Sequence, residues 1–196
     1  MLKTGLLCFI ILLLLHSSCS NNKKYRGGLY SVDSLISAQA RYLSENKASL
    51  SKTTRLGDRK DNVLVIPKDT IAWKKELEIF VALEIINKPI NRSLYKSEIT
   101  SDIRSNLSVR SFTATEELPV KYLKIYYRDT PDKVRLIEAQ YDESNALFKS
   151  ARSLTMEFLE VNNKTVLTSY SIVGGQKMFL GDSVEYNIAG ALTIKN

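Results

Sequence analysis

Histidine and cysteine are almost absent from this 196-residue chain, which contains one histidine and two cysteines. His16, Cys8 and Cys19 all lie within the first nineteen residues. The rest of the chain therefore cannot form a Ser-His-Asp triad, a thiol nucleophile, a Cys-X-X-Cys redox pair or an iron–sulfur cluster. It also lacks the imidazole and thiolate ligands of ordinary zinc sites. These absences exclude most common enzyme mechanisms.

Glycine is scarce as well, with eight residues, and none of them forms the Gly-X-Gly-X-X-Gly or P-loop spacing that cradles nucleotide phosphates. A site made of carboxylates alone, glycosidase-like or calcium-binding, survives these exclusions. Its candidates are the acidic residues of the expected turns and loops: Asp58, Asp61, Glu116, Glu117, Asp129, Asp132, Asp142 and Glu143. Acidic residues in turns are usually solvated turn-formers, so we expect no catalytic residue, no metal and no cofactor.

The N-terminus has the order of a secretory signal. Lys3 precedes an apolar run from Leu6 to Leu15, and the small residues Ser17 and Ser18 follow. The run is shorter than the ~20 residues that a permanent transmembrane helix needs. Ser17-Ser18-Cys19 resembles the lipobox of bacterial lipoproteins, in which the cysteine is acylated with palmitate-like chains and becomes the new N-terminus. His16 stands where that family usually has leucine; an ordinary cleaved signal with an incidental cysteine is the alternative.

This interpretation divides the chain into a signal peptide (1–18), a lipidated tether (19–28) and one globular domain (29–196). Cleavage removes one of the 28 basic residues and lowers the formal charge from +7 to +6. Cys19 is then the only cysteine, so no disulfide forms within the chain and stability must come from a core. The eight residues of the polar stretch 21–28 span at most ~28 Å, which keeps the domain near the membrane.

The first part of the domain has two helical patterns and a hairpin. Ser31 is expected to cap a helix that runs to about Lys47, with an apolar stripe at helical spacing. Residues 50–56 and 63–66 are expected to be strands around a polar turn. A second helix is expected from Asp69 or Thr70 to Lys88-Pro89. Its second half, 79–86, is apolar almost all round, which indicates burial on several sides and leaves a strand as an alternative.

From about residue 107 the apolar period changes to two, which is typical of strands. Six strands are expected, at 107–115, 120–128, 133–141, 153–161, 165–173 and 183–194. Short turn-like connections, such as Asn162-Asn163, favour antiparallel neighbours. The similar segments 170–174 and 186–190 are expected to be strands that end at a glycine bulge or bend. The predicted fold is α+β, with N-terminal helices packed on a curved, roughly six-stranded antiparallel β-meander.

Two other patterns have a functional and a structural interpretation. Six tyrosines of the expected strands could form a stacking face for a ligand, although tyrosine also favours half-buried sheets. These tyrosines are Tyr122, Tyr126, Tyr127, Tyr141, Tyr170 and Tyr186. Lys149 beside Ser150 and Ser153 could be imagined as a Ser–Lys pair, although solvation at a strand edge is the favoured explanation. Lysine and arginine are scattered, which argues against nucleic-acid binding.

The leucine-rich signal ending in Ser-Ser-Cys-Ser resembles lipoproteins of the Bacteroidetes. Short segments of the body resemble small uncharacterised lipoproteins of that group, namely 73–80, 86–89, 145–148 and 170–174. By this resemblance Ser20 implies sorting to the outer membrane. The acidic surface-export signal of that phylum is replaced by Asn21-Asn22-Lys23-Lys24, which implies a periplasm-facing anchor.

The resemblance implies no known activity. We expect a non-enzymatic accessory or protein-interaction module of the cell envelope, with the membrane and an envelope protein as partners. The alternative is a carrier of lipid or another apolar ligand, which would need a continuous apolar cavity between helices and sheet. Three Asp-Ser/Thr-aliphatic triplets also resemble the Bacteroidetes O-glycosylation acceptor and imply Ser34, Thr70 and Ser183 as candidates. Two of these triplets lie where a helix needs a cap.

Overall fold

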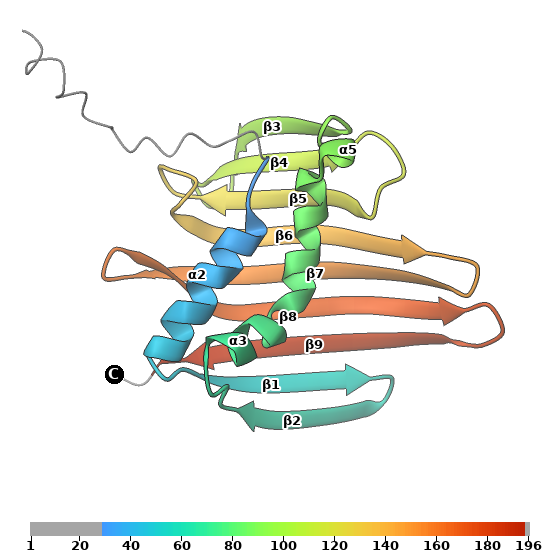
Figure 1. The fold of residues 1–196 in the computed structure, drawn as a ribbon, viewed down its shortest axis with the longest axis horizontal. Coiled ribbons are helices and arrows are strands. Elements are labelled where there is room, and N and C mark those ends of the chain that lie inside the picture. The colour runs from blue at the N-terminus through green and yellow to red at the C-terminus, as the bar shows by residue number, and fades with distance from the viewer. Residues whose placement is uncertain (1–28, 195–196) are drawn as a thin grey trace, which may run out of the picture.

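The structure is a computed structural model that describes residues 29–194. A long helix, a β-hairpin, a chain of short helical segments and seven further strands follow one another (Figure 1). The helices are α2 (Val32–Glu45), α3 (Thr70–Glu76), α4 (Glu78–Val81), the 3₁₀ helix η1 (Ala82–Asn87) and α5 (Pro89–Arg92). The strands are β1 (Ser49–Leu56), β2 (Arg59–Val65), β3 (Tyr95–Ser101), β4 (Ser108–Ala114), β5 (Val120–Tyr127), β6 (Val134–Ser144), β7 (Phe148–Val161), β8 (Lys164–Met178) and β9 (Ser183–Thr193).

All nine of these strands form one antiparallel sheet in the order β2-β1-β9-β8-β7-β6-β5-β4-β3. The protein is mostly β, with 21% helix, so the predicted α+β fold with a roughly six-stranded meander was wrong. Each of the six strands predicted after residue 107 exists, but the sheet gains three more. The N-terminal hairpin adds two at one edge, and β3 adds one at the other edge.

The hairpin joins the sheet because β1 pairs with β9, the last strand of the chain. Leu50 lies opposite Leu192 and Thr54 opposite Ile188, so the apolar side chains of the two strands share one face. The turn between β1 and β2 is only Gly57-Asp58, with Gly57 at a φ of +58°, a conformation that favours glycine. The predicted polar turn was therefore too long.

The edge strand β3 was missed because its sequence has no period of two. Tyr95 is buried, and its other six residues are exposed. An edge strand pairs on one side only, and here neither face beyond Tyr95 is covered. Such a strand leaves no apolar alternation for sequence reasoning to detect.

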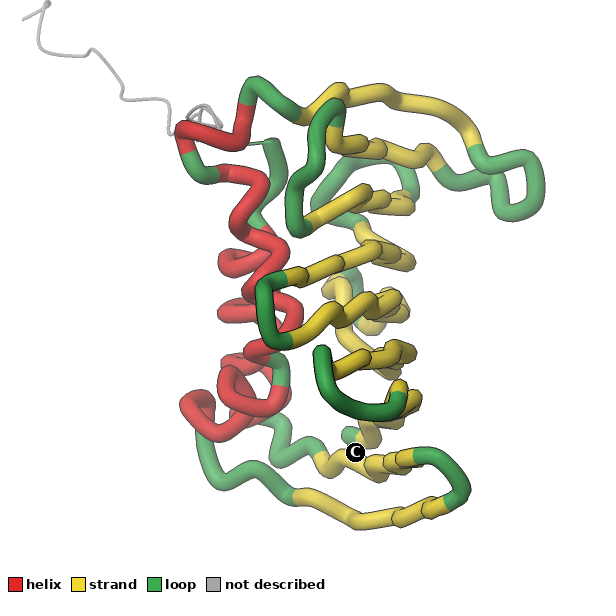
Figure 2. Tube along the Cα trace, turned by 90° about the vertical axis from the view of Figure 1, so that its right-hand side faces the viewer, coloured by secondary structure: helices red, strands yellow, loops and turns green. Residues whose placement is uncertain are grey.

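The helix α2 confirms the first helical prediction. The Ser31 hydroxyl accepts a hydrogen bond from the backbone N–H of Ser34 at 3.2 Å and so caps the helix. The helices lie together on one face of the sheet (Figure 2). Gln39 connects them to it: its side-chain amide donates to the carbonyl of Thr165 and accepts from the N–H of Leu167, at 2.9 and 2.8 Å.

The second predicted helix is divided into α3, α4 and η1. Trp73 of α3 is fully buried, and four residues later a row of fully buried side chains begins that has a spacing of three residues: Leu77, Phe80, Leu83 and Ile86. A 3₁₀ helix has three residues per turn, so this spacing places one apolar row against the sheet. The intervening Ile79, Val81 and Ile85 are only partly buried, so burial is concentrated on one side.

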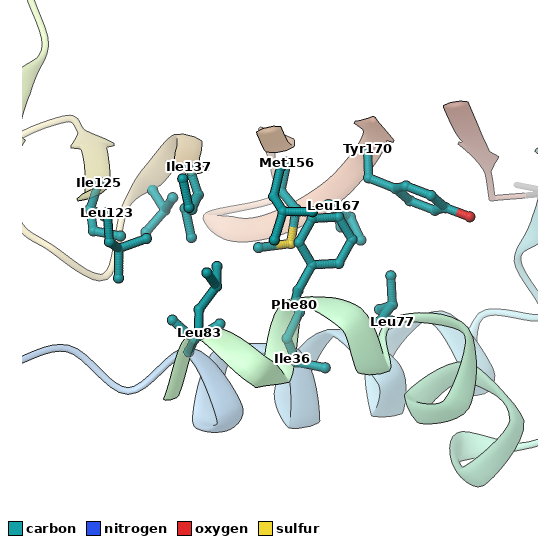
Figure 3. Packing of buried hydrophobic residues seen from close by; sticks show 14 of the residues in the cluster. Ile36, Leu77, Phe80, Leu83, Leu123, Ile125, Ile137, Met156, Leu167 and Tyr170 are labelled. Carbon is teal, nitrogen blue, oxygen red and sulfur yellow. The ribbon is translucent and has the colours of Figure 1, made fainter. Parts of the chain in front are cut away.

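This row completes a filled core between the helices and the sheet (Figure 3). Phe80 points from α4 toward Met156 and Leu167 of the sheet, and its ring meets the Tyr170 ring edge-on at 5.7 Å. Beside it, a Glu76 carboxylate oxygen accepts from the Tyr170 hydroxyl and the Lys52 ammonium, each at 2.6 Å. Apolar packing and one polar network thus hold α3 and α4 to the sheet.

The two similar segments of β8 and β9 lie opposite each other with their order reversed. Tyr170 pairs with Gly190, and Gly174 pairs with Tyr186. Both glycines lie inside strands, so the predicted bulges or bends were wrong. Each glycine instead leaves room for the tyrosine ring of the other segment, a pairing that protects the glycine backbone from water.

We predict that Gly190→Ala lowers the free energy of unfolding by about 1–3 kcal/mol, the usual cost of overpacking a core. An added Cβ would overlap the Tyr170 ring and lie 2.9 Å from Cδ1 of Leu50. Gly175→Ala is the matched control, since its nearest neighbour would be 3.7 Å away. Urea denaturation of the two variants compares them; equal stability would contradict the packing argument.

Candidate interaction surface

Two neighbouring hairpins extend past the helices at one end of the sheet. They are formed by β6–β7 and β8–β9, and Figure 1 shows their turns side by side at the right. The strands β7 and β8 are 14 and 15 residues long, so the helices cover only part of their length. This end of the sheet therefore has side chains that the core does not use.

Hydrogen bonds order the two turns and join them. The Asn145 side-chain oxygen accepts from the N–H groups of Leu147 and Phe148, at 2.8 and 3.0 Å. This is the local bonding by which asparagine stabilises turns. The N–H of Phe179, in the other turn, donates to the carbonyl of Leu147 at 2.8 Å. The two turns therefore form one unit.

That unit presents large apolar side chains to solvent. Leu147 is 69% exposed, Phe179 78% and Leu180 91%. Together with Phe148 and Met178 they form what we call the apolar tip. A hollow of about 280 Å³ lies among four of these side chains, all except Leu180, and is also lined by Lys149 and Lys177. A cluster of exposed apolar side chains marks a surface that contacts something other than water.

Two lysines lie directly behind the apolar tip. Lys149 of β7 and Lys177 of β8 are cross-strand partners, and their row continues with Ser144 of β6 and Ser183 of β9. Like charges directly opposite each other destabilise a sheet. Neither ammonium forms an ion pair with a described residue. This row therefore carries two positive charges that no described carboxylate neutralises in an ion pair, while Glu117, Asp142 and Glu143 line a groove beside it.

The next row on the same face has small residues in the centre and acids on both sides. Ala151 pairs with Gly175, and they are flanked by Asp142 and Glu185. Asp142, Ala151 and Gly175 line a groove of about 700 Å³ together with both lysines. Because side chains alternate along a strand, these two rows face away from the helices, opposite to the buried Leu154 and Ile172.

Three of the eight carboxylates that the sequence offers as candidates, Glu117, Asp142 and Glu143, line the 700 Å³ groove, and the other five lie elsewhere. Asp129 and Asp132 lie in the β5–β6 connection, at the end of the sheet opposite the apolar tip. Asp61, Asp142 and Glu143 lie in strands, not in loops as predicted. A hydrogen bond from Lys121 holds the pKa of Glu117 below its ordinary value. Within residues 29–194 no group of three or more potential metal ligands is present.

Two other sequence hypotheses fail on strand geometry. Lys149 and Ser150 are adjacent in β7, so they point to opposite faces. Ser150 is buried, and Ser153 lies four residues after Lys149 along β7, about 13 Å away, where its hydroxyl donates to Gln140, so the imagined Ser–Lys pair does not form. The tyrosines also divide between the faces: Tyr122 and Tyr126 alternate with buried residues of β5, whereas Tyr170 belongs to the core. The six tyrosines therefore do not form one stacking face.

The O-glycosylation candidates lie in three separate places. Ser34 is exposed in the first turn of α2, Thr70 is half-buried at the start of α3, and Ser183 is exposed at the start of β9. Asp69 caps α3 by accepting a hydrogen bond from the N–H of Ala72. Helix capping therefore explains the aspartate of the Asp69-Thr70-Ile71 triplet. Modification of these three residues stays a prediction.

The signal peptide (1–18), Cys19 and the tether (19–28) lie outside the described residues. Among the residues that the structure does describe, no helix combines the length and apolar character needed to cross a bilayer. The anchor therefore rests on the sequence.

The apolar tip was not predicted, although its sequence contains a signal. Residues 146–148 and 178–180 are apolar within segments that turn, bounded by Asn145 and by Gly181-Asp182. Turns are usually built from glycine, proline and small polar residues, so apolar turns indicate a contact. By contrast, nothing in the sequence around Lys149 or Lys177 predicts that these two lysines are cross-strand partners.

Comparisons of the chain with models of known protein families, with curated proteins and with solved structures found no match.

Proposed function

We propose that this protein is an exported lipoprotein of the cell envelope that is anchored through Cys19 and acts as a non-enzymatic interaction module. Its domain works through contacts of the hairpin end with another envelope component. The observation that carries this proposal is the apolar tip, which stays exposed although the domain has a filled core of its own. The sorting residues Ser20 to Lys24 favour an outer-membrane anchor that faces the periplasm.

The filled core favours this function over the carrier of apolar ligands. A carrier needs about 300–1,000 Å³ of continuous apolar space, and its natural place here is between the helices and the sheet. That layer is occupied by side chains with no exposure, including Phe80, Leu83 and Met156 (Figure 3). The 700 Å³ groove lies instead at the hairpin end and has lysine and carboxylate side chains in its lining.

The anchor predicts a specific cysteine dependence. Cys19→Ala should remove palmitate labelling and move the protein from the membrane to the soluble fraction, because stable anchoring needs the acyl chains on that residue. Cys8→Ala is the matched control and should keep both labelling and membrane association. Metabolic labelling and fractionation measure the two effects. Palmitate incorporation into the Cys19→Ala protein would exclude the anchor.

Contact through the hairpin end predicts a position-dependent crosslink in intact cells. A photoreactive amino acid at Phe179 should form an adduct in the envelope, because that side chain is exposed at the apolar tip. Ile103, which is 98% exposed in the β3–β4 connection, is the control at the opposite end of the sheet. Electrophoresis and mass spectrometry detect the adducts. Equal adduct formation at the two positions would contradict a dedicated hairpin surface.

A further inference from the structure

The hairpin end carries its chemistry in a fixed order along the strands. The apolar tip comes first, the row of Lys149 and Lys177 second, and the row of Asp142 and Glu185 third. The second and third rows are two residues apart, about 6–7 Å along the strand. On the face away from the helices these three sets change from apolar to cationic to anionic with distance from the end of the sheet, and the exposed Asp182 of the β8–β9 turn lies beside the tip.

A phospholipid surface has the complementary order. Its acyl chains lie deepest, the anionic phosphates follow, and the ammonium groups of zwitterionic headgroups can lie farther out. We propose that the hairpin end docks into a phospholipid bilayer, with the apolar tip among the upper acyl chains and Lys149 and Lys177 on a headgroup phosphate. This inference rests on the proposed function, because it names the partner of the same surface.

The lysine pair is the strongest argument for a phosphate. Two opposed ammonium groups repel each other, and a phosphate between them would reverse that repulsion by accepting hydrogen bonds from both. The hydroxyls of Ser144 and Ser183 flank the pair and add further donors. Asp142 and Glu185 are placed to accept from an ammonium group, so the surface has partners for both charges of a zwitterionic headgroup.

The shape of the tip favours a bilayer over a folded protein partner. Leu147, Phe179 and Leu180 project from two adjacent turns, and they are among the exposed apolar residues of the domain. A protein partner would need a pocket shaped for each of these side chains. A bilayer interface accommodates projecting apolar side chains without such a pocket, and anionic lipid attracts nearby lysines.

Insertion can be measured with a tryptophan at the tip. The acylated full-length chain is reconstituted into phosphatidylethanolamine–phosphatidylglycerol vesicles that contain brominated lipids, which quench tryptophan in the acyl region. Phe179→Trp is compared with Ile103→Trp, and the native Trp73, fully buried in the core, supplies a constant background. We expect blue-shifted emission and several-fold stronger quenching for Phe179→Trp. Equal quenching at the two positions, or none at Phe179→Trp, would overturn the proposal.

The role of the lysine pair is tested without the anchor. The full-length Cys19→Ala chain is sedimented with the same vesicles, and its binding should weaken about 30-fold in Lys149→Gln/Lys177→Gln, since each lysine near an anionic surface contributes a factor of about five. Lys47→Gln/Lys164→Gln changes the net charge equally at the other end of the sheet and should have little effect. An equal loss in both double variants would overturn the headgroup assignment.

The two proposals fail in different ways. Loss of the acylated chain from vesicles would contradict the anchor, and Cys19→Ala fractionation tests the anchor alone. If the acylated chain stays on the vesicles but the Phe179→Trp emission is neither shifted nor quenched by the brominated lipids, bilayer docking is refuted. If Phe179 then crosslinks only to a protein in cells, the interaction module stands and its partner is not the bilayer.

Discussion

The free energy of unfolding should fall steeply as the pH rises above 10, although the chain has no histidine after residue 16 and no thiol in its domain. The groups responsible are three tyrosines whose hydroxyls are held within the fold. Burial raises the pKa of Tyr95 to about 12. Burial, followed by the hydrogen bond and negative charge of Glu76, raises the pKa of Tyr170. Burial and Glu138 raise that of Tyr126 in the same way.

The direction follows from the protons that each state binds. At pH values above the ordinary tyrosine pKa of 10.0, the unfolded chain loses protons that the folded protein keeps. Stability is therefore fully present below pH 10 and is lost as the pH rises toward the raised pKa values of the folded state. The two protons that the buried Tyr95 and Tyr170 retain correspond to a loss of up to about 3 kcal/mol per pH unit, and the partly exposed Tyr126 adds less because solvent screens its interactions.

Urea denaturation at pH 9, 10.5 and 11.5 measures this loss. Tyr170→Phe removes one of the three hydroxyls and should reduce the slope by about 1.4 kcal/mol per pH unit. The same variant lowers stability at neutral pH, because Glu76 loses the hydrogen bond from the Tyr170 hydroxyl. If the free energy of unfolding falls with pH equally steeply in Tyr170→Phe and in the parent protein, the Tyr170 hydroxyl does not contribute to this loss of stability.

Phe80→Ala should lower the free energy of unfolding by about 3–5 kcal/mol, which is the upper range for truncating a core side chain. Phe80 is fully buried at the centre of the layer between helices and sheet, and its ring packs edge-on against Tyr170. The surrounding strands cannot collapse into the space because each is paired on both sides in the sheet. The loss is a large fraction of the roughly 5–15 kcal/mol that stabilises a typical domain.

Ile71→Ala is the control for this substitution, because Ile71 lies on the neighbouring helix α3 and is 78% exposed. Its stability should stay within about 0.5 kcal/mol of the parent protein. Thermal and urea denaturation distinguish the two variants. A loss of less than about 1 kcal/mol in Phe80→Ala would mean that the layer between helices and sheet is loosely packed, and would reopen the carrier hypothesis.

The sequence by itself determined the elements whose signals are local. The capped stripe of α2, the alternation of six strands and the Asn162-Asn163 turn were all predicted. Both asparagines of that turn have positive φ, at 50° and 60°, as a two-residue hairpin turn requires. Each of these signals lies within about fifteen residues, because helical and strand periods arise from the geometry of neighbouring residues.

The composition of the sheet was decided by pairing between distant segments. Nothing in β1 specifies β9 as its partner, because many strands expose an apolar face with the same period of two. The pairing of Tyr170 with Gly190 also cannot be inferred from the sequence, although the similarity of the segments 170–174 and 186–190 can. Their meaning depends on an antiparallel register that brings the first residue of one to the last residue of the other.

The candidate site depends on an even finer tertiary detail. A bulge between Glu157 and Phe158 shifts the register of β7 and β8 by one residue. Without that shift Lys149 would lie opposite Gln176, and the lysine pair would not form. The sequence therefore determined which local elements the chain contains, and it alone carries the proposed anchor at Cys19. Only the tertiary structure decided which side chains meet at the hairpin end, because a one-residue change of register moves side chains to the other face of a sheet.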